Sequence, residues 1–355
     1  MNGRNLVIDC GTTNLRVTLL GEDNRPAATA KAEGGVRNTA VDGHNGRLRA
    51  LLRESIESVL SQGGISAADV SRCVAYGMIT SDMGLMELGH LCAPASAADL
   101  RRGMREAVFE DVAPFPIAFI PGVRNFSGEV NFDNVSGMDM MRGEETEAVG
   151  LYDLLAPGGE AVFILPGSHN KFVSMGDRGQ ILGCMTSISG ELLDALTHHT
   201  ILADAVGHAF VSAEDYDETA AREGAWECAR SGLGRAAFAG RILSTLGKLP
   251  RASVQSYLLG AALALDVEAL GAFLPSRPDE TLSPMAILPD NVLGAMGVAQ
   301  PQPTSAPRIY VAGKPPVQRA MCDVLDALGF EGAQQVPREI SARMGTHGAA
   351  VIAQL

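Results

Sequence analysis

The 355-residue sequence has few cysteines, few aromatic residues and no concentration of positive charge. Its six cysteines are dispersed, without a CxxC pair or zinc-site spacing, which predicts reduced thiols in a cytoplasmic protein. The formal net charge of −13 comes from scattered acids, so the surface is expected to repel nucleic acid and anionic membranes. Neither is therefore an expected partner.

Neither a membrane span nor a leader is expected from the sequence. No apolar run approaches about 18 residues, so no membrane span is predicted. The first strand is expected within a few residues of Met1, which leaves no room for a signal peptide. With 46% hydrophobic and 19% charged residues, the composition is that of a globular protein, and the length predicts two domains.

A glycine turn near the N-terminus is the most informative stretch. Apolar strands are predicted on both sides of it, so the stretch reads as a hairpin. Gly11 lets the backbone approach an anion, and Thr12 and Thr13 add hydroxyls to the N–H groups that can meet phosphate oxygens. Asp9, at the strand end, is placed to hold Mg²⁺ directly or through water. The alternative is an ordinary hairpin in which a buried Asp9 caps its own turn.

Apolar periodicity predicts the remaining elements in outline. Helices are expected at 48–60, 96–104, 189–199, 214–230, 235–246, 254–270 and 348–355, and strands at 73–76, 117–120, 161–165, 171–175 and 309–313. A Pro-Gly-Gly stretch at 157–159 predicts a boundary between lobes 1–156 and 157–355. The final helix, about 344–355, is expected to pack back at the hinge. Residues 275–307 are rich in proline and are expected to form loops and an insertion.

A second hairpin repeats the pattern of the first. Gly167 and Ser168 lie in its turn, between two apolar strands. Lys171 could reach a phosphate as a point charge, or be a solvated strand residue. A late strand that ends in Gly313 leads into another helix. Two phosphate-type hairpins and this strand suit a nucleotide held between two lobes.

These stretches together resemble the actin, Hsp70 and sugar-kinase superfamily, and more narrowly the 2-dehydro-3-deoxygalactonokinase family. The resemblance is carried, in family order, by residues 9–16 (DCGTTNLR), 141–146 (MRGEET), 165–173 (LPGSHNKFV), 189–192 (SGEL) and 311–313 (VAG). It implies an α/β, two-lobed actin-like ATPase/sugar-kinase fold of the ribonuclease H-like kind, with the active site between the lobes. The nucleotide-binding residues would be Gly11, Thr12, Thr13, Gly167, Ser168, Lys171 and Gly313.

The resemblance also implies a reaction. The protein would use ATP and Mg²⁺ to phosphorylate a small 2-keto-3-deoxy sugar acid to its 6-phosphate; a homodimer is left open. Glu144 and Glu145 begin a predicted helix, as the catalytic acid does in related kinases, and Glu145 aligns better. The helix N-terminus is expected to keep Glu145 ionised, ready to take a proton from the acceptor hydroxyl. The alternative is that both glutamates only complement the helix dipole.

Further residues are candidates for holding the acceptor. Arg16 and Arg142 could grip its carboxylate, because a guanidinium fork suits that group, or could pair with Asp9 or Glu144. Met78 and Met83 are candidates for the pocket wall, the alternative being that they only fill the core. Two other functions remain open from the sequence: a phosphohydrolase on the same fold, and a non-catalytic sensor of a sugar acid or nucleotide.

Overall fold

The computed structural model describes residues 4–274 and 307–355. Contacts divide the chain into two compact units, Met1–Gly159 with Met175–Cys184 and Glu339–Leu355, and Glu160–Ser174 with Met185–Arg338. Each unit is described by itself. Such units are not a test of domains, so the division after residue 156 stays a prediction. The insertion predicted at 275–307 lies, except for its last residue, outside the described residues.

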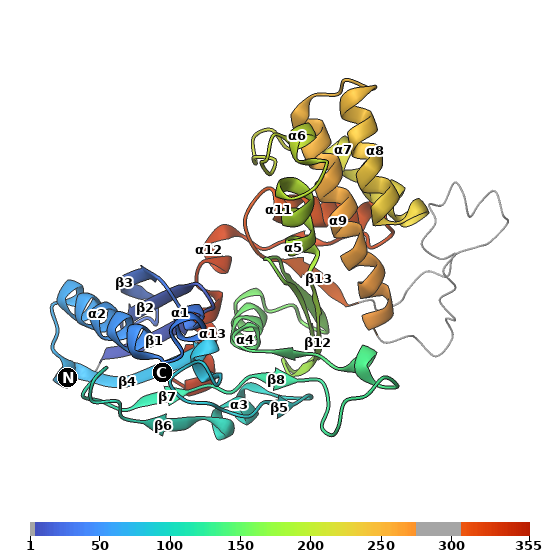
Figure 1. The fold of residues 1–355 in the computed structure, drawn as a ribbon. Coiled ribbons are helices and arrows are strands. Elements are labelled where there is room, and N and C mark those ends of the chain that lie inside the picture. The colour runs from blue at the N-terminus through green and yellow to red at the C-terminus, as the bar shows by residue number, and fades with distance from the viewer. Residues whose placement is uncertain (1–3, 275–306) are drawn as a thin grey trace. The chain divides into compact units, whose positions relative to one another are not determined.

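The first unit contains a six-stranded sheet in the order β3-β2-β1-β4-β7-β6 (Figure 1). Its strands are β1 (Arg4–Cys10), β2 (Asn14–Leu20), β3 (Pro26–Glu33), β4 (Val70–Gly77), β6 (Arg105–Ala107) and β7 (Ile117–Phe119). β1 and β2 form the antiparallel hairpin expected from the sequence, and β4 lies parallel to β1 on its other side. The carboxyl ends of β1 and β4 are therefore neighbours, with Cys10 beside Gly77.

Helices and a smaller sheet complete this unit. The three-stranded sheet has the order β5-β8-β9, from Leu91–Cys92, Val123–Arg124 and Met140–Met141. The helices are α1 (Val36–Asp42), α2 (Gly46–Gly63), α3 (Ala97–Gly103), α4 (Glu144–Leu155) and α13 (Met344–Ala353). α12 (Arg338–Ser341) starts on the last residue of the second unit. β3 and α1 were not predicted from the sequence.

The apolar stripe of α2 explains its packing. Leu48, Leu52 and Ile56 share a buried cluster with Leu6 and Ile8, alternate residues of β1. The helix runs past the predicted end at residue 60 to Gly63, and Gly64 then adopts the left-handed conformation that glycine accommodates without strain (φ 63°). Alternation turns Val7 to the opposite face of β1, and α13 packs against β1, β4 and α4. The sheet is therefore buried at its centre.

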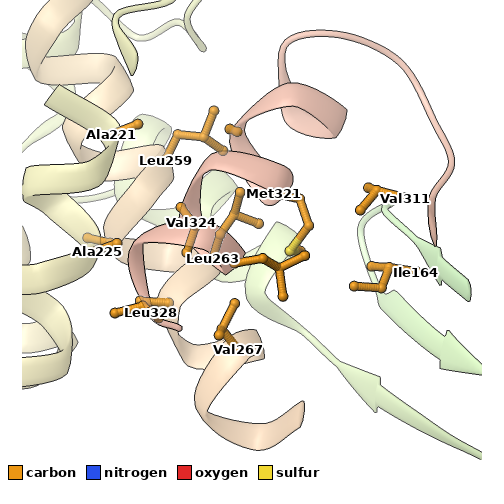
Figure 2. Close-up of a cluster of buried hydrophobic side chains, with 14 of the residues drawn as sticks. Ile164, Ala221, Ala225, Leu259, Leu263, Val267, Val311, Met321, Val324 and Leu328 are labelled. Atoms are coloured by element: carbon orange, nitrogen blue, oxygen red, sulfur yellow. The ribbon is translucent and has the colours of Figure 1, made fainter. Parts of the chain in front are cut away.

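A five-stranded sheet in the order β12-β11-β10-β13-β14 lies mainly in the second unit; Met175 of β11 and residues 181–184 of β12 are counted with the first unit. Its strands are β10 (Ala161–Leu165), β11 (Asn170–Met175), β12 (Ile181–Ser187), β13 (Arg308–Val311) and β14 (Gln334–Gln335). Its helices are α5 (Ser189–His198), α6 (Ala203–Val206), α7 (Glu218–Ser231), α8 (Leu233–Thr245), α9 (Arg251–Phe273) and α11 (Val317–Ala327). Figure 2 shows Ile164 and Val311, from neighbouring strands, facing Leu263 of α9 and Met321 of α11 in one apolar cluster.

α9 is a 23-residue helix that is long and apolar enough to cross a membrane by length and composition. Asp266 and Glu268 interrupt its apolar residues, so it does not contradict the prediction that no apolar run approaches about 18 residues. Core helices pass the same test, and 67% of the apolar window is buried inside the protein. α7, α8 and α11 all pack against α9. We therefore interpret α9 as a core helix.

Candidate active site

The turn between β1 and β2 is exposed, and the start of α1 packs closely against its carbonyl groups. The Gly11 amide donates to the Asn14 carbonyl at 2.9 Å, while Thr12 and Thr13 face solvent. The amide of Arg37, in α1, donates to the Thr12 carbonyl at 3.0 Å. A Cβ on Gly35 would overlap the Gly11 carbonyl oxygen and stand 2.7 Å from that of Thr12. Only glycine at this position lets α1 start so close to the turn.

Asp9 lies at the carboxyl end of β1, beside this turn. Its carboxylate is 3.9 Å from the Arg16 guanidinium on β2, and 30% of its side chain is exposed. The Tyr76 hydroxyl, on β4, donates a hydrogen bond to it. Burial raises the pKa of Asp9, while Arg16 and the Tyr76 hydrogen bond oppose that rise. The structure thus brings together three side chains from the three central strands.

The start of α4 supplies two carboxylates. Gly143 has φ 120°, a conformation that favours glycine. Glu144 Oε2 accepts from the Arg142 amide at 3.0 Å, and Glu145 Oε2 accepts from the Gly143 amide at 2.7 Å. Both glutamates therefore accept hydrogen bonds from the two amides that precede the first turn of α4. Their catalytic role stays a prediction.

Burial opposes the expected ionisation of Glu145. Its side chain has no exposed area, and burial together with the nearby Glu144 raises the pKa of Glu145 to about 8. The hydrogen bonds from the Gly143 amide and the Thr146 hydroxyl lower the pKa but do not compensate for burial. The sequence-based expectation considered only the helix N-terminus, which lowers the pKa of Glu145. Burial, which raises that pKa, is the stronger effect here.

Glu147 was missed by the sequence analysis. Burial raises the pKa of Glu147 well above its usual range, and the charges of Asp9, Glu144 and Glu145 act in the same direction. Gly345 of α13 packs against it and against the Tyr76 hydroxyl, so closely that a Cβ on Gly345 would overlap that oxygen. Glu147 lies one helical turn after Glu144, and this spacing was the signal in the sequence that could have identified it.

Arg142 is engaged by the protein itself. Its Nη1 donates to the carbonyl and hydroxyl of Thr80 at 2.6 and 2.7 Å, and its Nη2 donates to the Leu88 carbonyl at 3.0 Å. The guanidinium therefore holds the loop that follows β4. In that loop, Met78 and Met83 are half-buried and pack on the hydrophobic core of the first unit.

The turn between β10 and β11, in the second unit, has the same design as the first. Gly167, Ser168 and His169 are exposed above a buried Asn170, whose Oδ1 accepts from the Gly167 amide at 2.8 Å. A Cβ on Gly190, the second residue of α5, would overlap the Gly167 carbonyl oxygen and stand 2.7 Å from that of Ser168. In both turns, therefore, the start of a helix packs against the carbonyl groups of the turn.

A pocket of about 500 Å³ opens beside this second turn. Gly167, Ser168 and the start of α5 form one wall, and apolar residues of α9, among them Leu259 and Ala262, form another. Pro316, just before α11, also lines it. An apolar cavity next to an exposed glycine turn suits a flat organic group attached to phosphates.

The two other nucleotide ligands predicted in the second unit are not among the residues that line this pocket. Lys171 is buried on β11 and donates to the Thr186 hydroxyl of β12. Gly313 follows β13 with φ 115° and packs against Pro166 of the turn. Gly313 therefore packs against the turn between β10 and β11, whereas Lys171 contacts the neighbouring strand β12. Both remain predictions as ligands.

A magnesium site made by protein alone is not seen in the described part of the chain. Among residues 4–274 and 307–355, no group of three or more His, Cys, Asp or Glu side chains could hold a metal ion. Mg²⁺ in kinases is usually held by one or two carboxylates together with substrate phosphates and water. The partly exposed Asp9 carboxylate fits that second arrangement.

Comparison with known proteins decides the family. Residues 9–294 match the family model described as 2-keto-3-deoxy-galactonokinase, a span that includes both turns and the start of α4. The chain belongs to this family. The recognition of a 2-keto-3-deoxy-galactonokinase from its motifs is therefore confirmed.

Two relatives of this 2-keto-3-deoxy-galactonokinase family member can be named. The chain is 29% identical over 202 residues to the "Probable 2-dehydro-3-deoxygalactonokinase DgoK1" of Rhizobium meliloti (strain 1021), which covers 57% of this chain and 59% of that protein. The match thus spans about three fifths of the curated relative. A Sinorhizobium meliloti crystal structure assigned as a 2-dehydro-3-deoxygalactonokinase superposes with a TM-score of 0.70, 21% identity and 98% coverage of both chains. This match confirms the predicted α/β fold of the sugar-kinase class.

Proposed function

We propose that the protein transfers the γ-phosphoryl group of ATP to a 2-keto-3-deoxy sugar acid, giving the 6-phosphate. The family match supports the reaction class. Beyond the family, the observation that carries the nucleotide part is the apolar pocket of about 500 Å³ beside the exposed Gly167–Ser168 turn. The pocket is large enough for a nucleoside, and the turn offers main-chain donors to the attached phosphates.

Residues of the first unit supply the acceptor chemistry in this proposal. Mg²⁺, when bound through Asp9, neutralises charge on the transferred group. Arg16 holds the carboxylate of the sugar acid. Its side chain is 41% exposed and its ion pair with Asp9 is long, 3.9 Å, so guanidinium donors remain for an anion. The guanidinium of Arg142 supports the loop after β4 through Thr80 and Leu88, and in this proposal it does not bind the substrate.

Proton removal from the acceptor hydroxyl is assigned to the start of α4. A carboxylate there takes the proton late, as the bond to phosphorus forms. Glu145 is the residue predicted from the resemblance, and its raised pKa of about 8 makes it a stronger base once ionised. Glu144 is the other candidate, and it is only half-buried, so it is the more accessible of the two.

Cytoplasmic location and assembly complete the proposal. The six cysteines are free thiols, and Cys10, Cys73, Cys184 and Cys228 are buried, which suits a reducing compartment. The net charge of −13 disfavours nucleic acid and anionic membranes as partners. A homodimer stays a prediction.

An ADP-release assay tests the proposed reaction. The protein is incubated with ATP and Mg²⁺ and a panel of aldonic and 2-keto-3-deoxy acids, with water alone as the control. We expect ADP release only with a 2-keto-3-deoxy acid. Release that ignores the acceptor would support a phosphohydrolase, and thermal stabilisation by ligands without turnover would support a sensor.

A further inference from the structure

Asp266 is a buried acid that the proposed reaction does not use. It lies in the middle of the apolar helix α9, between Leu265 and Val267, and has no exposed area. The groups that interact with it are the hydroxyls of Ser187 and Ser189 and the amide of Asn170, and no cation is among them. Burying a carboxylate without a counter-charge is unfavourable. If residue 266 only filled the core, leucine would stabilise the fold more than aspartate does.

The contacts of Asp266 lead to the second turn. Its Oδ2 accepts from Asn170 Nδ2 and from the Ser189 hydroxyl, both at 2.7 Å. Asn170 Nδ2 also donates to the Ser189 hydroxyl at 2.8 Å. Because a carboxylate only accepts, the amide nitrogen of Asn170 must face it. Asn170 Oδ1 is thereby turned to the Gly167 amide, from which it accepts at 2.8 Å.

This chain of hydrogen bonds fixes the shape of the exposed turn. Gly167 is held from beneath through Asn170, and Ser189 holds the start of α5, where Gly190 packs on the carbonyl groups of the turn. Asp266 Oδ1 makes no hydrogen bond of good geometry among the described residues, although the Ser187 hydroxyl interacts with the carboxylate. A buried carboxylate with an oxygen that lacks a well-formed hydrogen bond is a poor source of stability. This argues that Asp266 serves the turn rather than the fold.

We propose that Asp266 is a positioning residue that holds the Gly167–His169 turn, through Asn170 and Ser189, in the conformation that receives the nucleotide phosphates. The inference rests on the proposed function, because the turn is assigned to nucleotide phosphates there. Asp266 does not touch the nucleotide in this proposal. Its effect should therefore be confined to the phosphate part of the ligand.

Two substitutions of Asp266 separate this role from simple packing. Asp266→Asn keeps an acceptor at the position of Oδ2 and places its amide nitrogen at the position of Oδ1. Asp266→Leu keeps the size and removes the acceptor. Glu268→Leu, two residues further along α9 and half-buried, removes a carboxylate without reaching the turn and is the matched control. All are made in the full chain.

The measurement compares ADP with adenosine by calorimetry. We expect Asp266→Leu to weaken ADP about tenfold or more, by loss of a charged hydrogen-bond acceptor, while adenosine affinity stays within twofold. Asp266→Asn should restore most of the ADP affinity, and Glu268→Leu should match the wild type. In turnover, Asp266→Leu should raise KM for ATP and leave KM for the sugar acid unchanged.

Other results would overturn the inference in distinguishable ways. If the wild type binds ADP and Asp266→Leu binds it equally well, or loses ADP and adenosine together, Asp266 does not position the turn. If the wild type binds neither ADP nor ATP, the proposed function fails first. Should Asp266→Leu not fold, Asn170→Ala breaks the same link at Gly167, and an ADP affinity equal to the wild type there would likewise refute the role.

Discussion

Gly190 packs directly on Gly167, as Gly35 packs on Gly11. In each pair, a Cβ on the glycine near the helix start would overlap the carbonyl oxygen of the glycine in the turn. The pairs lie in different units, yet each turn joins the first two strands of its sheet and each helix begins on the turn's carbonyl groups. The same packing device therefore occurs twice in the chain.

Alanine at Gly190 should disturb the turn. The added Cβ must displace the Gly167 and Ser168 carbonyl groups, and shifts of this size in a binding loop reduce affinity about tenfold or more. ADP affinity measured by calorimetry tests this. Gly234→Ala is the matched control, because Gly234 is also the second residue of a helix and a Cβ there meets nothing within 4 Å. Equal ADP affinity in both variants would show that the turn tolerates displacement.

Asp9→Asn should lower kcat by about 10²–10³-fold, because charge neutralisation at the transferred phosphoryl group is the main contribution of the protein. Folding should survive, since the side chains have the same shape and burial already disfavours the charge on Asp9. Turnover and the melting temperature are both measured. Asp23→Asn, an exposed acid in the β2–β3 turn, is the control. Near-normal turnover in folded Asp9→Asn would remove Asp9 from the site.

Arg142→Lys should raise KM for the sugar acid and leave nucleotide affinity unchanged. Lysine keeps the charge but cannot donate from two nitrogens to Thr80 and Leu88 at once, so the loop after β4 loses one of its supports. Steady-state kinetics with each substrate varied in turn measures both constants. Arg102→Lys, exposed at the end of α3, provides the comparison. A rise in KM for ATP instead would contradict this assignment.

The sequence predicted much of this fold, because apolar patterns and glycines act locally. The hairpin at Gly11, the end of α2 at Gly64 and the strand before Pro166 all depend on neighbours in the chain. The candidate residues at the two turns were found for the same reason. Asp266 was missed, although an acid directly after the apolar run Leu263-Ala264-Leu265 was a visible signal. Its role depends on Asn170, 96 positions away in sequence.

The protonation of Glu145 could not be predicted in this way. A helix start favours a charged carboxylate, and the sequence shows the helix start. Burial of Glu145 depends instead on what the rest of the unit packs around α4, including α13. The same holds for β3 and α1, which contain few strongly apolar residues and were not recognised.

The two glutamates at the start of α4 should differ in turnover. If Glu145 is the base, Glu145→Gln should reduce kcat about 10²–10⁴-fold, because the amide cannot accept the proton. Glu144→Gln should then reduce kcat much less, because the side-chain oxygen that accepts from the Arg142 amide remains and only its charge is lost. Both are measured at saturating ATP and sugar acid. The reverse order would assign the base to Glu144, and losses below about tenfold in both would exclude an essential base here.

Glu145→Gln should also change how stability depends on pH. The pKa of Glu145 rises from its ordinary value of 4.5 to about 8 in the folded protein. Between these values the unfolded chain releases this proton and the folded protein keeps it, so Glu145 lowers the free energy of unfolding as pH rises, by up to about 1.4 kcal/mol per pH unit. Above pH 8 both states are ionised and the decline ends.

Gln copies the neutral form of Glu145, accepting from the Gly143 amide while its own amide faces the Thr146 hydroxyl. The free energy of unfolding is measured in urea from pH 4 to 9. The stability gain of Glu145→Gln over wild type should be near zero at pH 4, grow to pH 8 and then level off. Glu57→Gln, on the exposed face of α2, is the control and should leave the shape of the curve unchanged. A gain that does not depend on pH would mean that Glu145 is already ionised in the folded protein at neutral pH.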